Sequence, residues 1–510
     1  MSAIHSVFSW FMKKRYHQIE LFMKYPVEVQ NEVLESLLRQ AQSTVWGQKY
    51  AYREIRGHKA YSERVPLQSY EDLKPYVKRL KAGEQNLLWP TDINWFAKSS
   101  GTTSDRSKFI PVSREALEDC HYKGGKDLLA LYTHNHPDNT LYTGKSLVLG
   151  GSSQINNFRK DSYWGDLSSI LINNLPFWVE FRRVPDKQIA LMDGWEEKIE
   201  AMAQSVRDED VTVMAGVPSW TLVLLRRLIE LTGVNNISEL WPNLQLYMHG
   251  GVNFAPYAAQ FKELIPSPST HYYETFNASE GFFALQDQSH SDELLLLLDY
   301  GIYYEFIDTA HSHLEQPPTC SLEEVEVGKN YEMVISTNAG LWRYRLGDTV
   351  RFTSTSPFRL RVSGRTKHFI NAFGEELIID NAERALKSTC DELGCRVSDY
   401  TAGPVYMDAA AKGGAHEWLI EFEHAPDDLA LFAERLDSHL RELNSDYDAK
   451  RSGNLTLNMP VVRPMPKQTF YKWLKSKGKL GGQHKVPRLS NNREIIEDLY
   501  TLNQQAHLSA

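Results

Sequence analysis

The chain carries the stretch Ser99-Ser100-Gly101-Thr102-Thr103-Ser104-Asp105-Arg106-Ser107-Lys108, which gathers hydroxyl side chains, one glycine and a closing lysine. Glycine permits a tight backbone turn, hydroxyl and amide groups donate to phosphate oxygens, and lysine adds a compact positive charge. The P-loop NTPase pattern needs a second glycine with a lysine beside it, and both are missing here. Taken alone, the stretch fits either a phosphate-binding loop or an ordinary solvated loop.

The residues on either side of this stretch predict its setting. Trp95-Phe96-Ala97 precedes it and Phe109-Ile110-Pro111-Val112 follows it, and both segments have the composition of short β-strands. We therefore expect the loop to join two strands as a hairpin, which differs from the strand-to-helix setting of a P-loop.

Composition limits the class of protein. A chain of 510 residues is too long for a single core, so several lobes are expected. The formal net charge of -9 argues against a nucleic-acid partner bound through a broad basic field. The four cysteines form no Cys-x-x-Cys pair, so neither a disulfide framework nor a structural zinc site is predicted. A reducing, cytoplasmic environment is expected.

Neither a targeting segment nor a membrane partner is predicted. Lys13, Lys14 and Arg15 follow the apolar N-terminal patch, which is the wrong order for a signal peptide. The longest aliphatic run, 294–298, is far shorter than the roughly 20 residues of a membrane-spanning helix, and it predicts a buried strand.

Strands alternate with helices in the middle of the chain, which favours an α/β sheet with ligand-binding groups at the strand ends. The segment 211–218, a strand that ends in a turn, is followed by Ser219, the expected N-cap of a helix over 220–231. A strand over 244–248 ends at His249-Gly250-Gly251. Further helices are expected over 28–42, 113–131, 383–393 and 426–443, and further strands over 331–337 and 359–363.

Four later segments carry further chemistry. Phe276-Asn277-Ala278-Ser279-Glu280-Gly281 offers a ring suited to a purine and a carboxylate suited to Mg²⁺, and 342–348 ends in a Gly-Asp turn whose carboxylate can accept from ribose hydroxyls. Cations and glycines recur in Gly364-Arg365-Thr366-Lys367 and in 481–488, which contains Lys485. Each segment alone is also typical of packing, a plain turn, a linker or a solvated tail.

Taken in order, the five segments resemble the adenylate-forming superfamily of acyl-CoA synthetases, peptide-synthetase adenylation domains and luciferases. The closer resemblance is to the Gretchen Hagen family of acyl acid amido synthetases, through Tyr303-Tyr304-Glu305-Phe306-Ile307 and Gly340-Leu341-Trp342-Arg343-Tyr344-Arg345. It implies an α/β fold with a large, multi-lobed N-terminal adenylation domain of mixed sheets over 1–363. A smaller, mobile α/β domain over 364–510 would follow.

The resemblance also implies roles for individual residues. ATP phosphates would contact Ser99, Ser100, Gly101, Thr102 and Thr103, with Lys108 nearby. The remaining nucleotide contacts would come from Gly250, Gly251, Val252 and Phe276 at the adenine, Ser279 beside it, Asp348 at the ribose, and Arg365. Glu280 would hold Mg²⁺, Lys367 would lie at the hinge, and Lys485 would stabilise charge during adenylation.

Two features leave alternatives open. Phe276 stands where a tyrosine is more usual, which removes a hydroxyl but keeps the stacking face, and Asn277 stands where a small residue is common. Lys475, Lys477 and Lys479 lie close to Lys485, and a shift of register would exchange their roles.

The function implied is ATP-dependent adenylation of a carboxylic acid, followed by acyl transfer to an amine such as an amino acid. An acyl-CoA ligase and a catalytically inactive nucleotide-binding relative are the alternatives. Val217, Trp220 and Phe254 flank the strand-end turns near the expected adenine loop, where they serve either as acyl-pocket walls or as core. The acid, the amine and the oligomeric state do not follow from the sequence.

Overall fold

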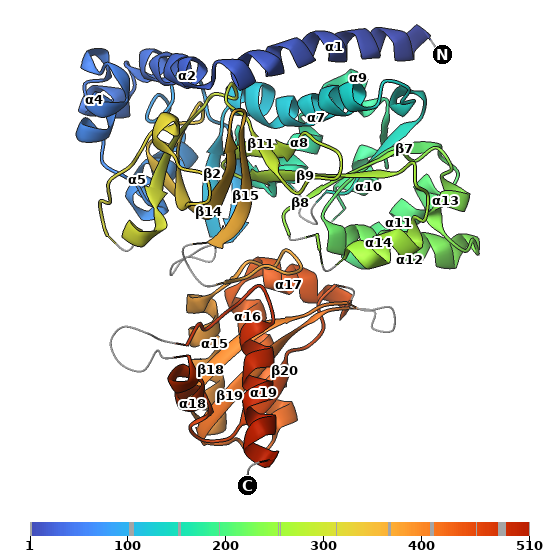
Figure 1. Ribbon diagram of the computed structural model, residues 1–510, viewed down its shortest axis with the longest axis vertical. Helices are drawn as coiled ribbons and strands as arrows, with labels where there is room; N and C mark the ends of the chain where they lie inside the picture. The colour runs from blue at the N-terminus through green and yellow to red at the C-terminus, as the bar shows by residue number, and fades with distance from the viewer. Residues whose placement is uncertain are drawn as a thin grey trace.

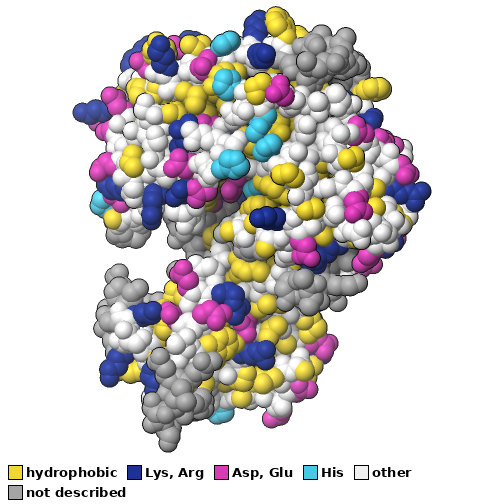
Figure 2. Space-filling view, turned by 45° about the vertical axis from the view of Figure 1, so that its right-hand side comes forward, with side chains coloured by type: hydrophobic (Ala, Val, Ile, Leu, Met, Phe, Trp, Pro, Cys, Tyr) yellow, Lys and Arg dark blue, Asp and Glu magenta, His cyan; other side chains and the backbone are white. Residues whose placement is uncertain are grey.

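The computed structural model describes residues 3–100, 107–150, 155–192, 194–252, 254–255, 257–312, 314–365, 369–407, 413–454, 456–477 and 486–508. Figure 1 shows a larger upper part and a smaller lower part, the latter built from the C-terminal segment of the chain. Both parts combine helices with sheets, which confirms the predicted fold class. Figure 2 shows a surface that is deeply indented between the two parts.

The upper part is organised on one mixed sheet, which has eleven strands among the described residues. From one edge to the other the order is β12 (Ile302–Asp308), β13 (Asn330–Thr337), β14 (Tyr344–Thr355), β15 (Phe358–Arg365), β11 (Leu294–Leu296), β10 (Gly281–Gln286), β9 (His271–Ala278), β8 (Leu246–Gly250), β7 (Val211–Ala215), β3 (Lys145–Val148) and β6 (Arg183–Val184). Strands β6, β3, β7, β8 and β9 run parallel, whereas the strands from β9 to β12 pair antiparallel. The carboxyl ends of β8 and β9 therefore lie at the same edge of the sheet.

Continuous hydrophobic runs form buried strands in both the parallel and the antiparallel part of this sheet. The parallel strand β7 reads Val-Thr-Val-Met-Ala, and four of its five residues are buried. Strands buried on both faces need such continuous runs, and helices cover the two faces. The aliphatic segment predicted as a buried strand is β11, and all three of its residues are buried.

A smaller sheet has the order β2 (Ser107–Val112), β1 (Trp95–Ser100), β5 (Ser162–Gly165) and β4 (Asn156–Arg159). Strands β1 and β2 pair antiparallel, with Ser99 opposite Lys108. This pairing confirms the predicted hairpin.

The helices of the upper part are α1 (Ala3–Lys24), α2 (Pro26–Ala41), α3 (Val45–Lys49), α4 (Gly57–Arg64), α5 (Tyr70–Lys81), α6 (Arg114–Ala116), α7 (Tyr122–Asn135), α8 (Leu167–Asn173), α9 (Phe177–Glu180), α10 (Lys187–Ala190), α11 (Trp195–Val206), α12 (Pro218–Thr232), α13 (Ile237–Leu240) and α14 (Ala258–Leu264). The helix predicted over 28–42 is confirmed as α2. The one predicted over 113–131 is broken by a π-helical turn at Leu117–His121.

The predicted N-cap of α12 is wrong. Val217 is the N-cap residue and Pro218 is the first residue of the helix, because the fixed φ of proline suits that position and its missing N–H costs no hydrogen bond there. Ser219 lies inside the helix, and its hydroxyl donates to the carbonyl of Phe373 at 3.2 Å.

The lower part contains a sheet with the order β18 (Arg396–Val405), β19 (Ala415–His424) and β20 (Val461–Met465), and a two-stranded pair, β16 (Phe369–Ile370) and β17 (Leu377–Ile378). Its helices are α15 (Ile379–Leu393), α16 (Leu429–Leu443), α17 (Ser445–Arg451), α18 (Thr469–Ser476) and α19 (Glu494–Leu508). Helices α15 and α16 confirm the two helices predicted in this region.

One hydrophobic core runs across the junction between the two parts. It includes Leu222 and Phe261 from the upper part and Phe373 and Trp418 from the lower part. Polar contacts reinforce the junction: the Tyr257 hydroxyl donates to the Ala372 carbonyl at 2.5 Å, and Gln260 Nε2 donates to the Met407 carbonyl at 2.8 Å. Among the helices described above, none has the length and apolarity needed to cross a bilayer.

Candidate active site

The two ends of the hydroxyl-rich stretch lie on neighbouring strands of the smaller sheet. Ser99 and Ser100 end β1, and Lys108 stands near the start of β2. Gly101, Thr102 and Thr103 lie outside the described residues, as do Lys367 and Lys485, so their predicted roles remain predictions.

A tyrosine joins Lys108 to the carboxylate predicted to hold Mg²⁺. Lys108 Nζ lies 3.5 Å from the Tyr344 hydroxyl, and that hydroxyl donates to Glu280 Oε1 at 3.4 Å. These three residues come from β2, from β14 and from the turn between β9 and β10, so segments far apart in the sequence converge here.

Charge at this point is unbalanced toward the negative. Burial raises the pKa of Glu280, Lys108 lowers it, and the nearby carboxylates of Glu376 and Asp348 raise it further. A bound cation relieves such repulsion. Within the described ranges no group of three or more His, Cys, Asp or Glu side chains is arranged to hold a metal. A single carboxylate beside a phosphate-binding loop nevertheless fits Mg²⁺, which is commonly held by one or two carboxylates and by substrate phosphates.

Asp348 lies in a strand, so the predicted Gly-Asp turn is wrong. Gly347 and Asp348 lie within β14, where Gly347 has a φ of 88° and the pairing with β15 shifts register just beyond. Glycine tolerates this left-handed backbone conformation, which bends the strand without ending it. Asp348 is buried, and its backbone lies opposite that of Arg365 in the pairing of β14 with β15.

The loop predicted to line adenine follows β8. Gly250 lies opposite Thr275 in β9, and a Cβ at residue 250 would come within 2.4 Å of the Thr275 carbonyl oxygen. Gly251 has a φ of 81°, and its carbonyl accepts a hydrogen bond from Asn371 Nδ2 of the lower part at 3.1 Å. Val252 is buried. Only glycine permits the close strand approach at 250.

The aromatic motif continues from the next strand. Phe276 lies in β9 one residue after Thr275, and its half-buried ring lies 5.1 Å from that of Phe283, centroid to centroid. Ser279 lies in the turn beside Glu280 and is half-buried. The segment with Phe276, Ser279 and Glu280 thus lies at the same edge of the sheet as Gly250.

The three predicted acyl-pocket residues lie around the end of β8. A Cβ at residue 251 would lie 3.6 Å from Val217 Cγ2, which places Val217 against the adenine loop. Phe254 stacks on His249 with ring centroids 4.0 Å apart. Trp220 is buried beneath Lys450 of α17, whose Nζ lies 3.6 Å from the ring centroid. A pocket role for these residues remains a prediction.

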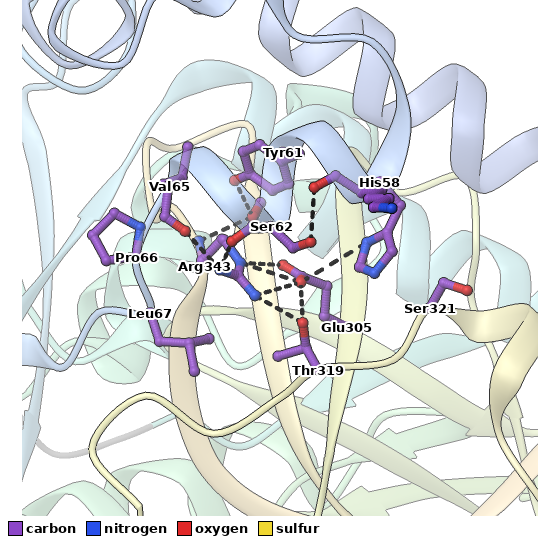
Figure 3. Close-up of polar contacts among 12 residues, drawn as sticks. His58, Tyr61, Ser62, Val65, Pro66, Leu67, Glu305, Thr319, Ser321 and Arg343 are labelled. Atoms are coloured by element: carbon purple, nitrogen blue, oxygen red, sulfur yellow. Dashed lines mark hydrogen bonds and ion pairs between the residues drawn. The ribbon is translucent and has the colours of Figure 1, made fainter.

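Sequence reasoning did not identify the role of Tyr344, although Tyr344 lies in the segment 340–345. It also assigned no role to Arg343 and Glu305, which form a buried ion pair (Figure 3). Both residues belong to the two segments that carry the closer family resemblance. The available signal was a glutamate in the otherwise apolar and aromatic segment 303–307 and an arginine in the segment 340–345.

Three family models match this chain. The GH3 family N-terminal domain matches residues 15–270, the GH3 family central domain matches 295–365, and the GH3 family C-terminal domain matches 380–494.

Similar curated proteins span nearly the whole chain. Indole-3-acetic acid-amido synthetase GH3.3 of Arabidopsis thaliana is 22% identical, with 94% of this chain and 92% of the relative covered. Jasmonoyl-L-amino acid synthetase GH3.5 of Oryza sativa subsp. japonica is 24% identical, with 97% of each chain covered.

Two solved structures are similar in fold. The GH3.15 acyl acid amido synthetase aligns with a TM-score of 0.61 at 17% identity and covers 96% of each chain. A 2-hydroxyisobutyryl-CoA ligase, in complex with 2-HIB-AMP and CoA, aligns with a TM-score of 0.58 at 13% identity, with 95% of this chain and 92% of the ligase covered.

Proposed function

Because the chain belongs to the GH3 family, whose N-terminal domain alone matches residues 15–270, we propose that it is an ATP-dependent acyl acid amido synthetase. The enzyme adenylates a small carboxylic acid and transfers the acyl group to an amino acid. One observation carries this proposal. Lys108, Tyr344 and Glu280 converge at the edge of the sheet where β8 ends in Gly250 and Gly251 follows.

The similar proteins support the choice of reaction class. The names of the two curated relatives describe an indole-3-acetic acid-amido synthetase and a jasmonoyl-L-amino acid synthetase, each of which joins an acid to an amino group. The chain is similar to both along nearly its whole length. The solved structures support the fold that this chemistry requires.

In the first step, an oxygen of the substrate carboxylate attacks the α-phosphorus of ATP. The bond between the α-phosphorus and the bridging oxygen breaks, and pyrophosphate leaves. Lys108 and the hydroxyl-rich loop hold the phosphates, where positive charge and backbone donors stabilise the developing negative charge. Asp348 accepts hydrogen bonds from the ribose hydroxyls, and Phe276 stacks on the adenine.

Mg²⁺, held by Glu280 and by phosphate oxygens, would neutralise phosphate charge when bound. Lys485 supplies a second positive charge near the α-phosphate. Two of the alternative lysines lie within the described residues: Lys475 is in α18, and Lys477 is the residue that directly follows this helix.

In the second step, the amino nitrogen attacks the acyl carbon of the adenylate. The bond from that carbon to the phosphate oxygen breaks, AMP leaves, and the nitrogen loses a proton as the amide forms. Activation as an adenylate is needed because a free carboxylate is a poor electrophile.

Two assays on the purified protein test the proposal. Pyrophosphate exchange into ATP, measured over a panel of aryl, indole and aliphatic acids, reports the first step. AMP release, measured with amino acids or with CoA added, reports the acceptor. Exchange with an amino-acid requirement for turnover supports the amido synthetase. A requirement for CoA instead would make the protein an acyl-CoA ligase, and ATP binding without exchange would indicate an inactive relative.

A further inference from the structure

Arg343, the residue directly before β14, and Glu305 of β12 form a buried, two-pronged ion pair (Figure 3). Arg343 Nε donates to Glu305 Oε2 at 2.9 Å and Nη2 donates to Oε1 at 2.8 Å, and the two side chains are 5% and 1% exposed. The Thr319 hydroxyl also donates to Glu305 Oε1, at 2.8 Å. Such a pair is costly to bury, so its geometry must be well satisfied.

The rest of the guanidinium is satisfied as well. Nη1 donates to the carbonyl oxygens of Ser62 and Val65 at 2.8 and 2.6 Å, and Nη2 donates to Thr319 Oγ1 at 2.8 Å. Together with the bonds to Glu305, these contacts use all five N–H groups of the arginine. Arg343 is therefore fixed to three separate segments of the upper part.

The backbone of Arg343 is strained. Its φ of 43° lies in the left-handed region, which residues other than glycine rarely adopt and which persists only when the surroundings enforce it. Gln68 enforces it from both sides, because its N–H donates to the Arg343 carbonyl and its carbonyl accepts from the Arg345 N–H, each at 2.9 Å. The Arg343 N–H donates to Ser336 Oγ at 3.0 Å.

The residue held between these two backbone contacts is Tyr344. Its side chain is buried, and its hydroxyl accepts from Lys108 Nζ and donates to Glu280 Oε1. The strained turn thus determines where the phenol enters the site.

We propose that Arg343 is a positioning residue that acts through Tyr344. The clamp, meaning the five hydrogen bonds of the buried Arg343 guanidinium, fixes the backbone that places the Tyr344 phenol between Lys108 and Glu280. The phenol in turn sets the spacing of Lys108 and Glu280 for binding the triphosphate of ATP. This inference rests on the proposed function, because Lys108 and Glu280 are nucleotide-binding groups only in that reaction. The inference requires that loss of the clamp weakens the binding of ATP without weakening the binding of the acid.

Two variants test the inference, each with a matched control. Tyr344→Phe removes only the hydroxyl, and Arg343→Lys removes the two-pronged geometry while keeping the charge. Tyr304→Phe is the control for the first variant, since the buried Tyr304 hydroxyl has no hydrogen-bond partner among the described residues. Arg359→Lys is the control for the second, because Arg359 makes a comparable pair with Asp287 through Nε at 3.0 Å and Nη2 at 2.7 Å.

Affinity for a non-hydrolysable ATP analogue is measured by titration calorimetry, with and without Mg²⁺, beside the KM values for ATP and acid in pyrophosphate exchange. We expect Tyr344→Phe and Arg343→Lys to raise the Kd of the analogue and the KM for ATP roughly threefold to tenfold, which corresponds to weakening one charged hydrogen bond. The KM for the acid should stay within about twofold, as should all values of the control variants.

Unchanged analogue affinity in both site variants would overturn the inference, as would an equal loss in the controls. If Arg343→Lys fails to fold, Tyr344→Phe still decides whether the phenol matters. Wild-type protein that binds the analogue but shows no exchange with any acid would contradict the proposed function alone, because the binding measurement still tests the clamp.

Discussion

Lys450 of α17 lies over the indole ring of Trp220 in α12, with its Nζ 3.6 Å from the ring centroid, so a cation–π contact joins the lower part of the molecule to the upper. Burial lowers the pKa of Lys450 to about 8, while Asp446, Asp166, Glu375 and Glu376 raise it. This contact covers one face of the Trp220 ring, and the sequence suggested Trp220 as either a pocket wall or a core residue.

The Lys450 contact predicts what Trp220→Phe does. The smaller ring offers a weaker face to the cation, so α17 should open more readily, and its backbone amides should exchange hydrogen faster. Trp241→Phe is the control, since Trp241 is buried in the same core and donates to the Val206 carbonyl in the upper part. We expect both variants to lose about 1–2 kcal/mol of stability, with faster exchange in α17 only for Trp220→Phe. A changed preference among acids in Trp220→Phe would favour the pocket role instead.

Glu280→Gln tests the predicted metal-binding carboxylate. The amide keeps the volume but has no charge to offer a cation, so we expect pyrophosphate exchange to fall roughly 100-fold and the half-saturating Mg²⁺ concentration to rise. Glu274→Gln is a matched control, because burial also raises the pKa of Glu274, to about 7, in the adjoining strand β9. Exchange by the control should stay within about threefold of the wild type. Equal rates for Glu280→Gln and wild type would exclude a role for Glu280.

Gly250→Ala tests the close approach of β8 to β9. The added Cβ would meet the Thr275 carbonyl oxygen at 2.4 Å, so the strands must separate beside the predicted adenine site. We expect a loss of about 1–3 kcal/mol of stability and a higher KM for ATP. Gly125→Ala in α7 is the control, because a Cβ there meets no atom within 4 Å, and alanine should stabilise that helix by about 0.5–1 kcal/mol. An unchanged KM for ATP in Gly250→Ala would exclude a role for Gly250 in nucleotide binding.

Acid should destabilise the protein through His249. Burial lowers the pKa of His249 to about 3, below its ordinary value of 6.5, so the folded state resists a proton that the unfolded chain accepts. The stability that the neutral ring contributes is present above pH 6.5 and is lost as the pH falls toward 3. The His249→Gln variant has no titrating group at this position. Relative to this variant, the free energy of unfolding of the wild type should fall by about 2 kcal/mol between pH 7 and pH 5. Denaturation midpoints at the two pH values measure this loss, and parallel changes in both proteins would contradict it.

The hairpin, the buried strands and several helices followed from the sequence because each depends on local pattern. The hydroxyl-rich stretch lies between two β-like segments, and their pairing needs only a tight turn. Ser219 was assigned wrongly as a cap because proline at 218 supplies a stronger start signal one residue earlier.

Relationships between distant segments could not be read in the same way. The ion pair joins Glu305 of β12 to Arg343, the residue directly before β14, and the left-handed backbone at Arg343 has no local signal in a non-glycine residue. Asp348 was expected in a turn because Gly-Asp commonly forms one, whereas pairing with Arg365 of β15 keeps it in a strand. Tertiary pairing overrides the local preference in both cases.

The most direct test of the adenylation mechanism follows an oxygen atom. A substrate acid labelled with ¹⁸O in its carboxylate is turned over with ATP and an amino acid, and the released AMP is analysed by mass spectrometry. Attack of the carboxylate on the α-phosphorus, followed by cleavage between the acyl carbon and that oxygen, predicts one ¹⁸O atom in AMP. Unlabelled AMP, or label in inorganic phosphate together with ADP, would contradict an acyl-adenylate.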